Sequence, residues 1–364
     1  MRTSQIGVMR EDIVQAFRWQ AQSSHNLGSP FHALLLGLLA ERLREPEPQA
    51  TRVGQRIARW SERTIADALA LRIVGGLHAL VRAGRAPGLA RLYPPASPSS
   101  VDLWPEVLRT LQDHDDFLHD FLDSPPQTNE VARSSILLGG ALLIAARTGL
   151  PLRWYEIGAS AGLNLLFDRY RYELGDRVWG APTAPVLIRS PWSGRAPDLT
   201  VPLSIASREG CDIAPLDPSS EAARERILSY VWPDQTDRLA RTKAALELAA
   251  ASSQRVTREP ASTFVARHFA ADTEDGVVRT LAHSIVWQYL PKSERDAVRQ
   301  ALAQAGARAT ERAPIAWFRM EADGAHNATQ NRGAALTLTV WPGGLEQEVG
   351  RGDFHGRWAR WGEP

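Results

Sequence analysis

The chain is short of cysteine, of net charge and of long apolar runs, and each shortage excludes a class of protein. Its 364 residues include a single cysteine, Cys211, which excludes an intramolecular disulfide and a zinc site built from several thiolates. The formal net charge is +1 at pH 7, so there is no electrostatic reason to expect nucleic acid or an anionic membrane as the main partner. The longest apolar runs, 33–40 and 136–146, are far shorter than the ~20 residues that span a bilayer.

The composition is that of a soluble globular protein, with 44% hydrophobic and 23% charged residues. Glu11 and Asp12 precede the first apolar run, so the beginning of the sequence does not resemble a secretory signal. His114 and His119 stand among acidic residues, but side chains five positions apart do not share a helix face, and we expect no metal site there. We therefore expect a cytoplasmic protein that binds a small molecule, without a metal and without nucleic acid or a membrane as partner.

The hydrophobic period divides the chain into two regions. In the first 150 residues apolar side chains recur at helical spacing, as in Ile13, Val14 and Phe17. Later, strand-like runs alternate with helical stretches, which is typical of a parallel sheet covered on both faces. We predict a helical cap or substrate region over 1–128 and a Rossmann-like α/β domain over 129–364, with seven mostly parallel strands. Its later strands are expected at 203–211, 255–257, 277–282, 315–320, 335–341 and either 345–349 or 357–361, and its helices at 221–231, 238–251 and 293–305.

The stretch 153–166 is the most informative part of the sequence, because it combines a buried strand, a turn of small residues and the start of a helix. Small residues let a backbone approach a ligand where a Cβ would clash, and a helix N-terminus supplies N–H donors. The pattern E-x-G-x-S-x-G resembles the first motif of class I S-adenosylmethionine-dependent methyltransferases, with Ser160 where a glycine often stands. The resemblance implies S-adenosylmethionine as the cofactor. The cofactor-binding residues that it predicts here are Glu156, Gly158, Ala159, Ser160, Gly162 and Asn164.

The same letters spell G-x-S-x-G, the nucleophile elbow of α/β-hydrolases, with Ser160 as nucleophile. In that interpretation a histidine such as His283, His326 or His355 would act as the base. A hydrolase elbow follows several earlier strands of its sheet, whereas the residues before Glu156 have helical patterns. A buried carboxylate two residues before the first glycine is also unusual in such an elbow, where that position is usually apolar. We therefore favour the cofactor cradle.

Residues that follow the next two predicted strands complete the cradle, because ligands of an open parallel sheet bind at the carboxyl ends of its strands. Asp212 resembles the methyltransferase acid that accepts both ribose hydroxyls, although a turn or helix cap would explain it equally well. It lies about fifty residues beyond Gly162, so an insertion around 179–200 must be looped out. Glu259 follows the third strand, where methyltransferases often contact adenine; the alternative is an exposed loop charge.

The stretch 283–291 follows the fourth predicted strand and resembles the segment that lies beside the sulfonium in many small-molecule methyltransferases. His283 could act as a base near neutral pH, or could be a structural histidine at a strand end. The aromatic residues could equally be packing residues. From this segment we predict catalytic roles for His283 and Tyr289, a cofactor contact for Ser284, and substrate contacts for Trp287 and Gln288.

The apolar helix that precedes the first strand begins with polar residues. Asn129, Glu130 and Arg133 stand close together there, and capping plus an ion pair would explain them without function. A helix antiparallel to the strand would nevertheless bring them beside the glycine turn, over the strand's carboxyl end. We predict that they bind the substrate, or that Arg133 binds the cofactor's carboxylate.

The segments 127–134, 156–172, 283–291 and 341–344 together resemble a bacterial family catalogued only as a domain of unknown function. This resemblance covers nearly the whole chain and implies no activity. The sequence therefore predicts S-adenosylmethionine-dependent methyl transfer to a small molecule. Two alternatives stay open, a noncatalytic sensor or scaffold that binds the cofactor, and a serine hydrolase that uses Ser160.

Overall fold

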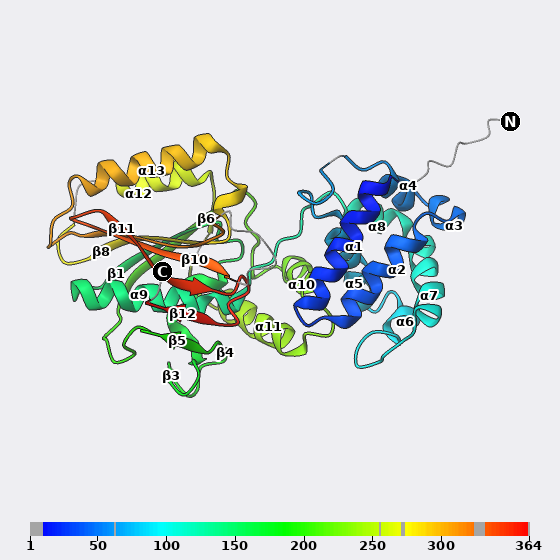
Figure 1. The fold of residues 1–364 in the computed structure, drawn as a ribbon, viewed down its shortest axis with the longest axis horizontal. Helices are drawn as coiled ribbons and strands as arrows, with labels where there is room; N and C mark the ends of the chain where they lie inside the picture. Colours follow the sequence, from blue (N-terminus) through cyan, green and yellow to red (C-terminus); the bar gives the residue numbers. More distant parts are fainter. Residues whose placement is uncertain (1–9, 62, 255, 271–273, 324–331, 363–364) are drawn as a thin grey trace. The chain divides into compact units, whose positions relative to one another are not determined.

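The computed structural model describes residues 10–61, 63–254, 256–270, 274–323 and 332–362 (Figure 1). The chain forms two compact units. The first consists of Met1–Thr128 and Glu221–Ala240, and the second of Asn129–Ser220 and Arg241–Pro364. The sequence pattern places 221–240 in the second region. In the structure these residues fold with the first, helical unit instead.

The first unit is helical. Its long α5 carries Gly75, where a Cβ would lie 2.5 Å from the Tyr230 ring, so α10 and the residues after it pack closely on α5. His78 Nδ1 also hydrogen-bonds the Ser229 carbonyl at 3.0 Å. These contacts explain why 221–240 folds with this unit. The helices are α1 (Glu11–Asn26), α2 (Pro30–Arg42), α3 (Pro46–Gln49), α4 (Arg52–Ala58), α5 (Leu69–Arg82), α6 (Pro87–Ala90), α7 (Ser100–Asp113), α8 (Asp115–Phe121) and α10 (Glu221–Ser229), while α11 (Thr236–Ala250) passes into the second unit.

The second unit contains a nine-stranded sheet of order β5-β12-β11-β10-β9-β8-β1-β6-β7. The five strands β9, β8, β1, β6 and β7 are parallel to one another, and β10, β11 and β12 continue the sheet beyond β9 as antiparallel strands. Edge strand β5 pairs in parallel with β12. The bounds are β1 (Leu152–Ile157), β5 (Trp192–Gly194), β6 (Ile205–Asp212), β7 (Val256–Arg258), β8 (Val278–Ser284), β9 (Ile315–Glu321), β10 (Ala334–Trp341), β11 (Leu345–Gly352) and β12 (Ala359–Trp361).

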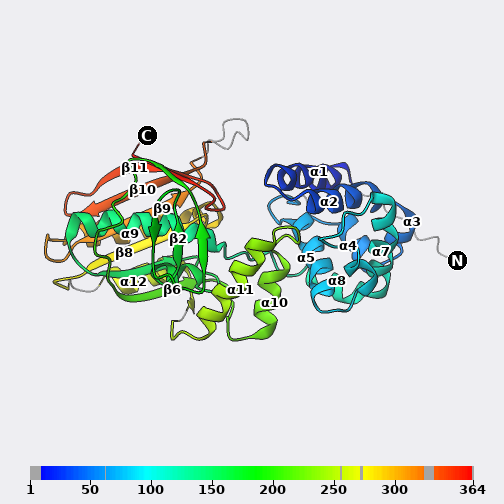
Figure 2. The ribbon, with the colours of Figure 1, turned by 90° about the horizontal axis from the view of Figure 1, so that it is seen from below.

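Helices cover both faces of this sheet. Alternate residues of β1 mark the two faces, because Trp154 packs on Phe167 and Tyr155 packs on Phe264. Figure 1 shows α12 and α13 on one face and α9 on the other, and Figure 2, seen from below, shows α9 in front of the sheet. The covering elements are α9 (Ser134–Thr148), α12 (Ala261–Phe269), α13 (Lys292–Gly306) and the short 3₁₀ segments η1 (Val131–Arg133), η2 (Leu163–Arg169) and η3 (Trp287–Tyr289).

The fold is the expected mixture of helices and a large, mostly parallel sheet, but its strand count and two local elements differ from the prediction. The main sheet has nine described strands instead of seven, because both alternatives for the last strand form and β5 adds an edge. The insertion contributes a separate sheet of β2 (Arg171–Glu173), β3 (Val178–Trp179) and β4 (Leu187–Arg189). The segment after the glycine turn is the 3₁₀ helix η2 and not an α-helix.

The stretch Val131–Thr148 is long and apolar enough to span a membrane, judged by length and composition alone. Within the fold 72% of this stretch is buried. On α9, Gly140 touches the β9 ring of Phe318 so closely that a Cβ would lie 2.5 Å from it. These contacts are those of a core helix that packs on one face of the sheet.

Candidate functional site

The turn after β1 is built from three left-handed residues. Gly158, Ser160 and Gly162 have φ values of 68°, 54° and 73°. A Cβ on Gly158 would lie 2.4 Å from Val286 Cγ2, so the approach of the loop after β8 requires glycine at this position. Ser160 adopts a conformation that costs a non-glycine residue roughly 1–2 kcal/mol. The turn is thus held in a strained and specific shape.

Asp212, at the end of β6, holds this turn in place. One carboxylate oxygen accepts the Ser160 N–H at 3.0 Å, and the other accepts the Ala214 N–H at 2.9 Å. The Leu216 N–H returns to the Ser160 carbonyl at 3.3 Å. The predicted ribose acid is therefore beside the turn, as expected, but each of its oxygens already binds a backbone N–H.

Glu156 lies at the carboxyl end of β1, opposite Gly210 of β6 and Ala282 of β8. Its side chain is 2% exposed and points to the face of α9, because it alternates with Tyr155. Its Oε2 has no hydrogen-bond partner among the described residues. Burial raises the pKa of this carboxyl to about 8, although the positive charge of Arg133 acts in the opposite direction.

The segment before α9 lies against the turn, as the antiparallel helix predicts. Asn129 Oδ1 accepts the Leu163 N–H at 2.9 Å, and Asn164 Nδ2 donates to the Glu130 carbonyl at 3.3 Å. The first N–H of η2 is therefore engaged by the protein and does not face a ligand. Arg133 donates from Nε to the Phe354 carbonyl at 2.8 Å. Its positive charge also favours the ionised form of the Glu156 carboxyl.

Several buried acceptors around the turn have no hydrogen-bond partner in the part of the chain that the structure describes. They are Glu156 Oε2, Ser160 Oγ and Asn164 Oδ1, and their residues are at most 6% exposed. Buried polar atoms in native proteins nearly always form hydrogen bonds, so these acceptors are available to donors from a ligand or from ordered water. Arg241 of α11 lies near them and forms an ion pair with Glu130 at 3.5 Å.

His283 does not join this group. It follows Ala282 on β8 and therefore points to the opposite face of the sheet from Glu156. Its Nδ1 hydrogen-bonds Glu321 at 2.7 Å, its Nε2 accepts the indole N–H of Trp317 at 3.1 Å, and Trp287 stacks on its ring. Because both nitrogens are engaged, the geometry gives the predicted base role no support and describes a structural histidine.

The other residues predicted around η3 are also spread out. Ser284 ends β8 on the same face as Glu156 and is 9% exposed, so it remains near the turn. Tyr289 is 71% exposed and Gln288 is exposed as well, whereas Trp287 packs on the α13 face. These three side chains therefore do not join the buried acceptors, and their catalytic and substrate roles stay predictions.

Glu259 has partners that do not involve a ligand. Its Oε1 accepts the hydroxyl of Thr257 at 2.6 Å and pairs with Arg267. It also sits beside Asp212 through a backbone hydrogen bond from its own N–H at 3.2 Å. Its predicted adenine contact stays a prediction.

The hydrolase arrangement is not assembled in the described part of the chain. Ser160 has the positive φ that an elbow needs, but its Oγ has no hydrogen-bond partner. Both nitrogens of His283 are occupied elsewhere, no hydrogen bond joins His355 to Ser160, and His326 lies outside the described residues. Within the described ranges, no three histidine, cysteine, aspartate or glutamate side chains gather as a metal site.

Sequence reasoning missed two residues of the site region. Glu321 ends β9, and one of its oxygens receives both the His283 Nδ1–H and the Val286 N–H at 3.1 Å. A search of polar residues at every strand end would have found it. Arg241 lies in the middle of a helix, and no local pattern distinguishes it from a surface arginine.

The fold and its site define a mixed α/β protein whose buried polar atoms gather at the carboxyl end of the central parallel strands. The chain belongs to the bacterial family described as an uncharacterized conserved protein (DUF2332), which matches residues 14–361. No curated protein and no solved structure matches the chain.

Proposed function

We propose that this protein binds S-adenosylmethionine at the glycine turn and transfers its methyl group to a small molecule. The observation that carries the proposal is buried Glu156 near the carboxyl end of β1, because none of the described residues forms a hydrogen bond with its Oε2. The chain runs from β1 outward to β6 and β7 and then returns to β8 on the other side of β1. Such a switch point is where open α/β sheets bind ligands. The order β7-β6-β1-β8-β9 resembles the order 3-2-1-4-5 of Rossmann-like sheets, which supports the proposal.

The unpartnered atoms match the methionine end of the cofactor. Its ammonium group brings donors that Glu156 Oε2 and Asn164 Oδ1 can accept. Its carboxylate suits a guanidinium, and Arg133 lies close enough to influence the Glu156 carboxyl. When bound, the cofactor supplies a methyl group on an electrophilic sulfonium sulfur.

The protein's own contribution would be alignment and the exclusion of water. Asp212 fixes the turn, and the contact of Val286 with Gly158 fixes the loop after β8 against it. No buried base is required if the acceptor is already nucleophilic. This agrees with the hydrogen bonds that occupy both ring nitrogens of His283. A cytoplasmic location would suit such a reaction.

Equilibrium titration tests the proposal. Purified protein is titrated calorimetrically with S-adenosylmethionine and S-adenosylhomocysteine, with NAD and ATP as comparison ligands. We expect binding of the two sulfur ligands, and a roughly ten- to hundredfold loss of affinity in Glu156→Ala, because one charge-assisted hydrogen bond disappears. Binding of NAD or ATP without either sulfur ligand would reject the cofactor.

Two other functions give different results in simple assays. A noncatalytic sensor would bind the cofactor but form no S-adenosylhomocysteine with any acceptor pool. Only the positive φ of Ser160 favours a serine hydrolase, because no described histidine forms a hydrogen bond with its Oγ. A hydrolase would be labelled by a fluorophosphonate probe. Labelling that disappears in Ser160→Ala would replace our proposal by the hydrolase.

A further inference from the structure

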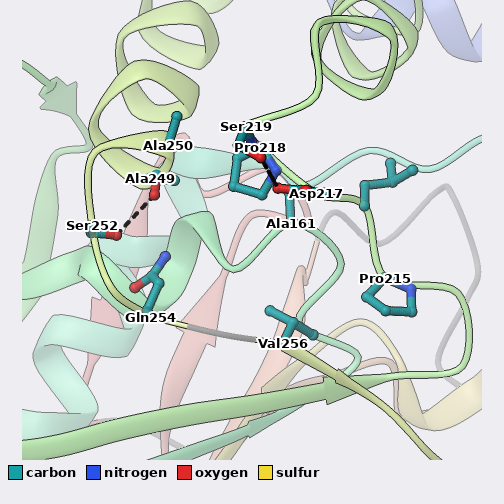
Figure 3. A pocket seen from close by; sticks show the side chains of 11 residues that line it. Ala161, Pro215, Asp217, Pro218, Ser219, Ala249, Ala250, Ser252, Gln254 and Val256 are labelled. Carbon is teal, nitrogen blue, oxygen red and sulfur yellow. Dashed lines mark hydrogen bonds between the residues drawn. The ribbon is translucent and has the colours of Figure 1, made fainter.

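A cavity of about 460 Å³ lies beside the glycine turn (Figure 3). Its walls come from the loop after β6, at 215–219, and from residues between the end of α11 and the start of β7, namely Ala249, Ala250, Ser252, Gln254 and Val256. Ala161 of the turn completes the lining. Two hydrogen bonds connect these walls to the turn, because Gln254 Nε2 donates to the Gly162 carbonyl at 2.7 Å and the Leu216 N–H donates to the Ser160 carbonyl at 3.3 Å.

The lining suits a flat, uncharged body with hydroxyl or amino donors at its edge. Pro215, Pro218 and Val256 provide apolar walls, and no lysine or arginine is among the lining residues that the structure describes. Asp217 is the one ionisable residue there, and the hydrogen bonds from Ser219 hold its pKa below the ordinary value. The cavity therefore disfavours an anion and offers a carboxylate to vicinal hydroxyls.

Asp212 is poorly placed to serve such hydroxyls. Both of its oxygens accept backbone N–H groups, and one of these bonds holds the turn at Ser160. Asp217 instead uses only Oδ1, which accepts the N–H and the hydroxyl of Ser219 at 2.8 and 2.7 Å. Among the described residues its other oxygen, Oδ2, accepts no hydrogen bond, and the side chain is exposed, so Oδ2 is accessible.

We propose that this cavity binds the nucleoside half of the cofactor and that Asp217, and not Asp212, accepts the ribose hydroxyls. This inference rests on the proposed function, since it assigns the second half of the same ligand. The methionine half then lies toward Glu156, with the glycine turn between the two parts.

Asp217 could also be retained only for its turn, and the chain offers a matched control for that role. Asp198 Oδ1 accepts the N–H and the hydroxyl of Thr200 at 2.9 and 2.8 Å, which is the same local arrangement. Asp198 is also exposed, but it does not line the cavity. Asp198→Asn therefore reproduces the loss of a turn carboxylate without touching the proposed site.

The cavity itself can be filled from α11. Ala250 lines it, whereas its neighbour Ala251 is exposed and does not. Ala250→Phe should obstruct the cavity, and Ala251→Phe adds the same ring just outside it. Equal melting temperatures of the two variants would show that differences in binding do not come from unfolding.

Calorimetric titration with S-adenosylhomocysteine and 5′-methylthioadenosine tests the inference, because the second ligand carries the nucleoside without the amino acid. We expect Asp217→Asn to weaken both ligands about tenfold and Ala250→Phe to abolish both, while Asp198→Asn and Ala251→Phe bind like the parent. Glu156→Ala should weaken S-adenosylhomocysteine alone.

The possible failures are distinguishable. If the parent binds S-adenosylhomocysteine but Asp217→Asn and Ala250→Phe bind it equally well, the nucleoside assignment is wrong and the proposed function stands. If Asp212→Asn loses affinity with an unchanged melting temperature while Asp217→Asn does not, the ribose acid is Asp212. If the parent binds neither ligand, both proposals fall.

Discussion

Replacing Glu156 by glutamine should change the way in which the stability of the protein depends on pH. Burial raises the pKa of the Glu156 carboxyl from its ordinary value of 4.5 to about 8, so the folded protein holds a proton that the unfolded chain releases. This contribution to stability is fully present below pH 4.5 and is lost as the pH rises toward about 8. Glutamine has nearly the same shape but never ionises, so it removes this dependence.

The size of the effect follows from the width of that interval. Between 4.5 and about 8 each pH unit costs the parent about 1.4 kcal/mol of folding free energy relative to Glu156→Gln. The whole interval corresponds to about 5 kcal/mol, which is an upper bound because a charged carboxylate admits water or moves. Over pH 5.5 to 7.5 we expect the variant to gain at most about 3 kcal/mol on the parent.

Urea unfolding followed by tryptophan fluorescence measures this difference at each pH. Taking the difference between parent and Glu156→Gln removes the contributions of all other titrating groups. The reasoning is refuted if the two proteins keep a constant difference across pH 5.5 to 8.5. Saturating S-adenosylhomocysteine should flatten the difference profile, because its ammonium group would compensate the ionised carboxylate of the parent.

Three further perturbations test other parts of the structure. Gly158→Ala would place a Cβ 2.4 Å from Val286 in a left-handed conformation, and should lower the free energy of unfolding by about 1–3 kcal/mol in urea titrations. His283→Ala should lower the free energy of unfolding by about 3 kcal/mol at pH 7, because two buried hydrogen bonds are lost. An unchanged urea midpoint would contradict the structural role of His283. Burial lowers the pKa of His32 to about 3 and of His78 to about 4, so the first unit should lose up to about 1.4 kcal/mol per histidine for each pH unit below 6.5; a flat midpoint between pH 7 and 5 would contradict this.

The sequence was sufficient for the main features of the sheet, because they depend on local pattern. The strand that carries Glu156 and the strands near 278, 315 and 334 are rich in apolar residues and are bounded by turn residues. The strands near 205 and 345 were also predicted, although both contain several polar residues. The apposition of Asn129 to Leu163 was also predictable, since one helix antiparallel to β1 connects the two segments.

Face assignment was the weak point of the sequence prediction. The fourth strand was expected to end at residue 282, so His283 stood in the following loop beside the cofactor. It runs to Ser284, which places His283 inside the strand, and each residue of a strand points to the face opposite its neighbour's. An error of two residues at a strand end was therefore enough to move the predicted base to the wrong side of the sheet.

Long-range partners could not be read from the sequence. Nothing in 221–240 indicates that it folds with the helical unit, because the contact of Gly75 with Tyr230 exists only after folding. The two roles of Asp212 and Asp217 are equally hidden, since both are acids in a loop after a strand. Only the folded structure separates them, because both oxygens of Asp212 accept backbone N–H groups, whereas Asp217 lines the cavity and accepts through Oδ1.

A crystal structure of the protein with S-adenosylhomocysteine tests the central claim most directly. We predict that the amino group of the ligand lies within hydrogen-bond distance of Glu156 Oε2 and Asn164 Oδ1, at the turn formed by Gly158 and Gly162. Ligand density at a different place, or an empty turn at a saturating concentration of the ligand, would contradict the account.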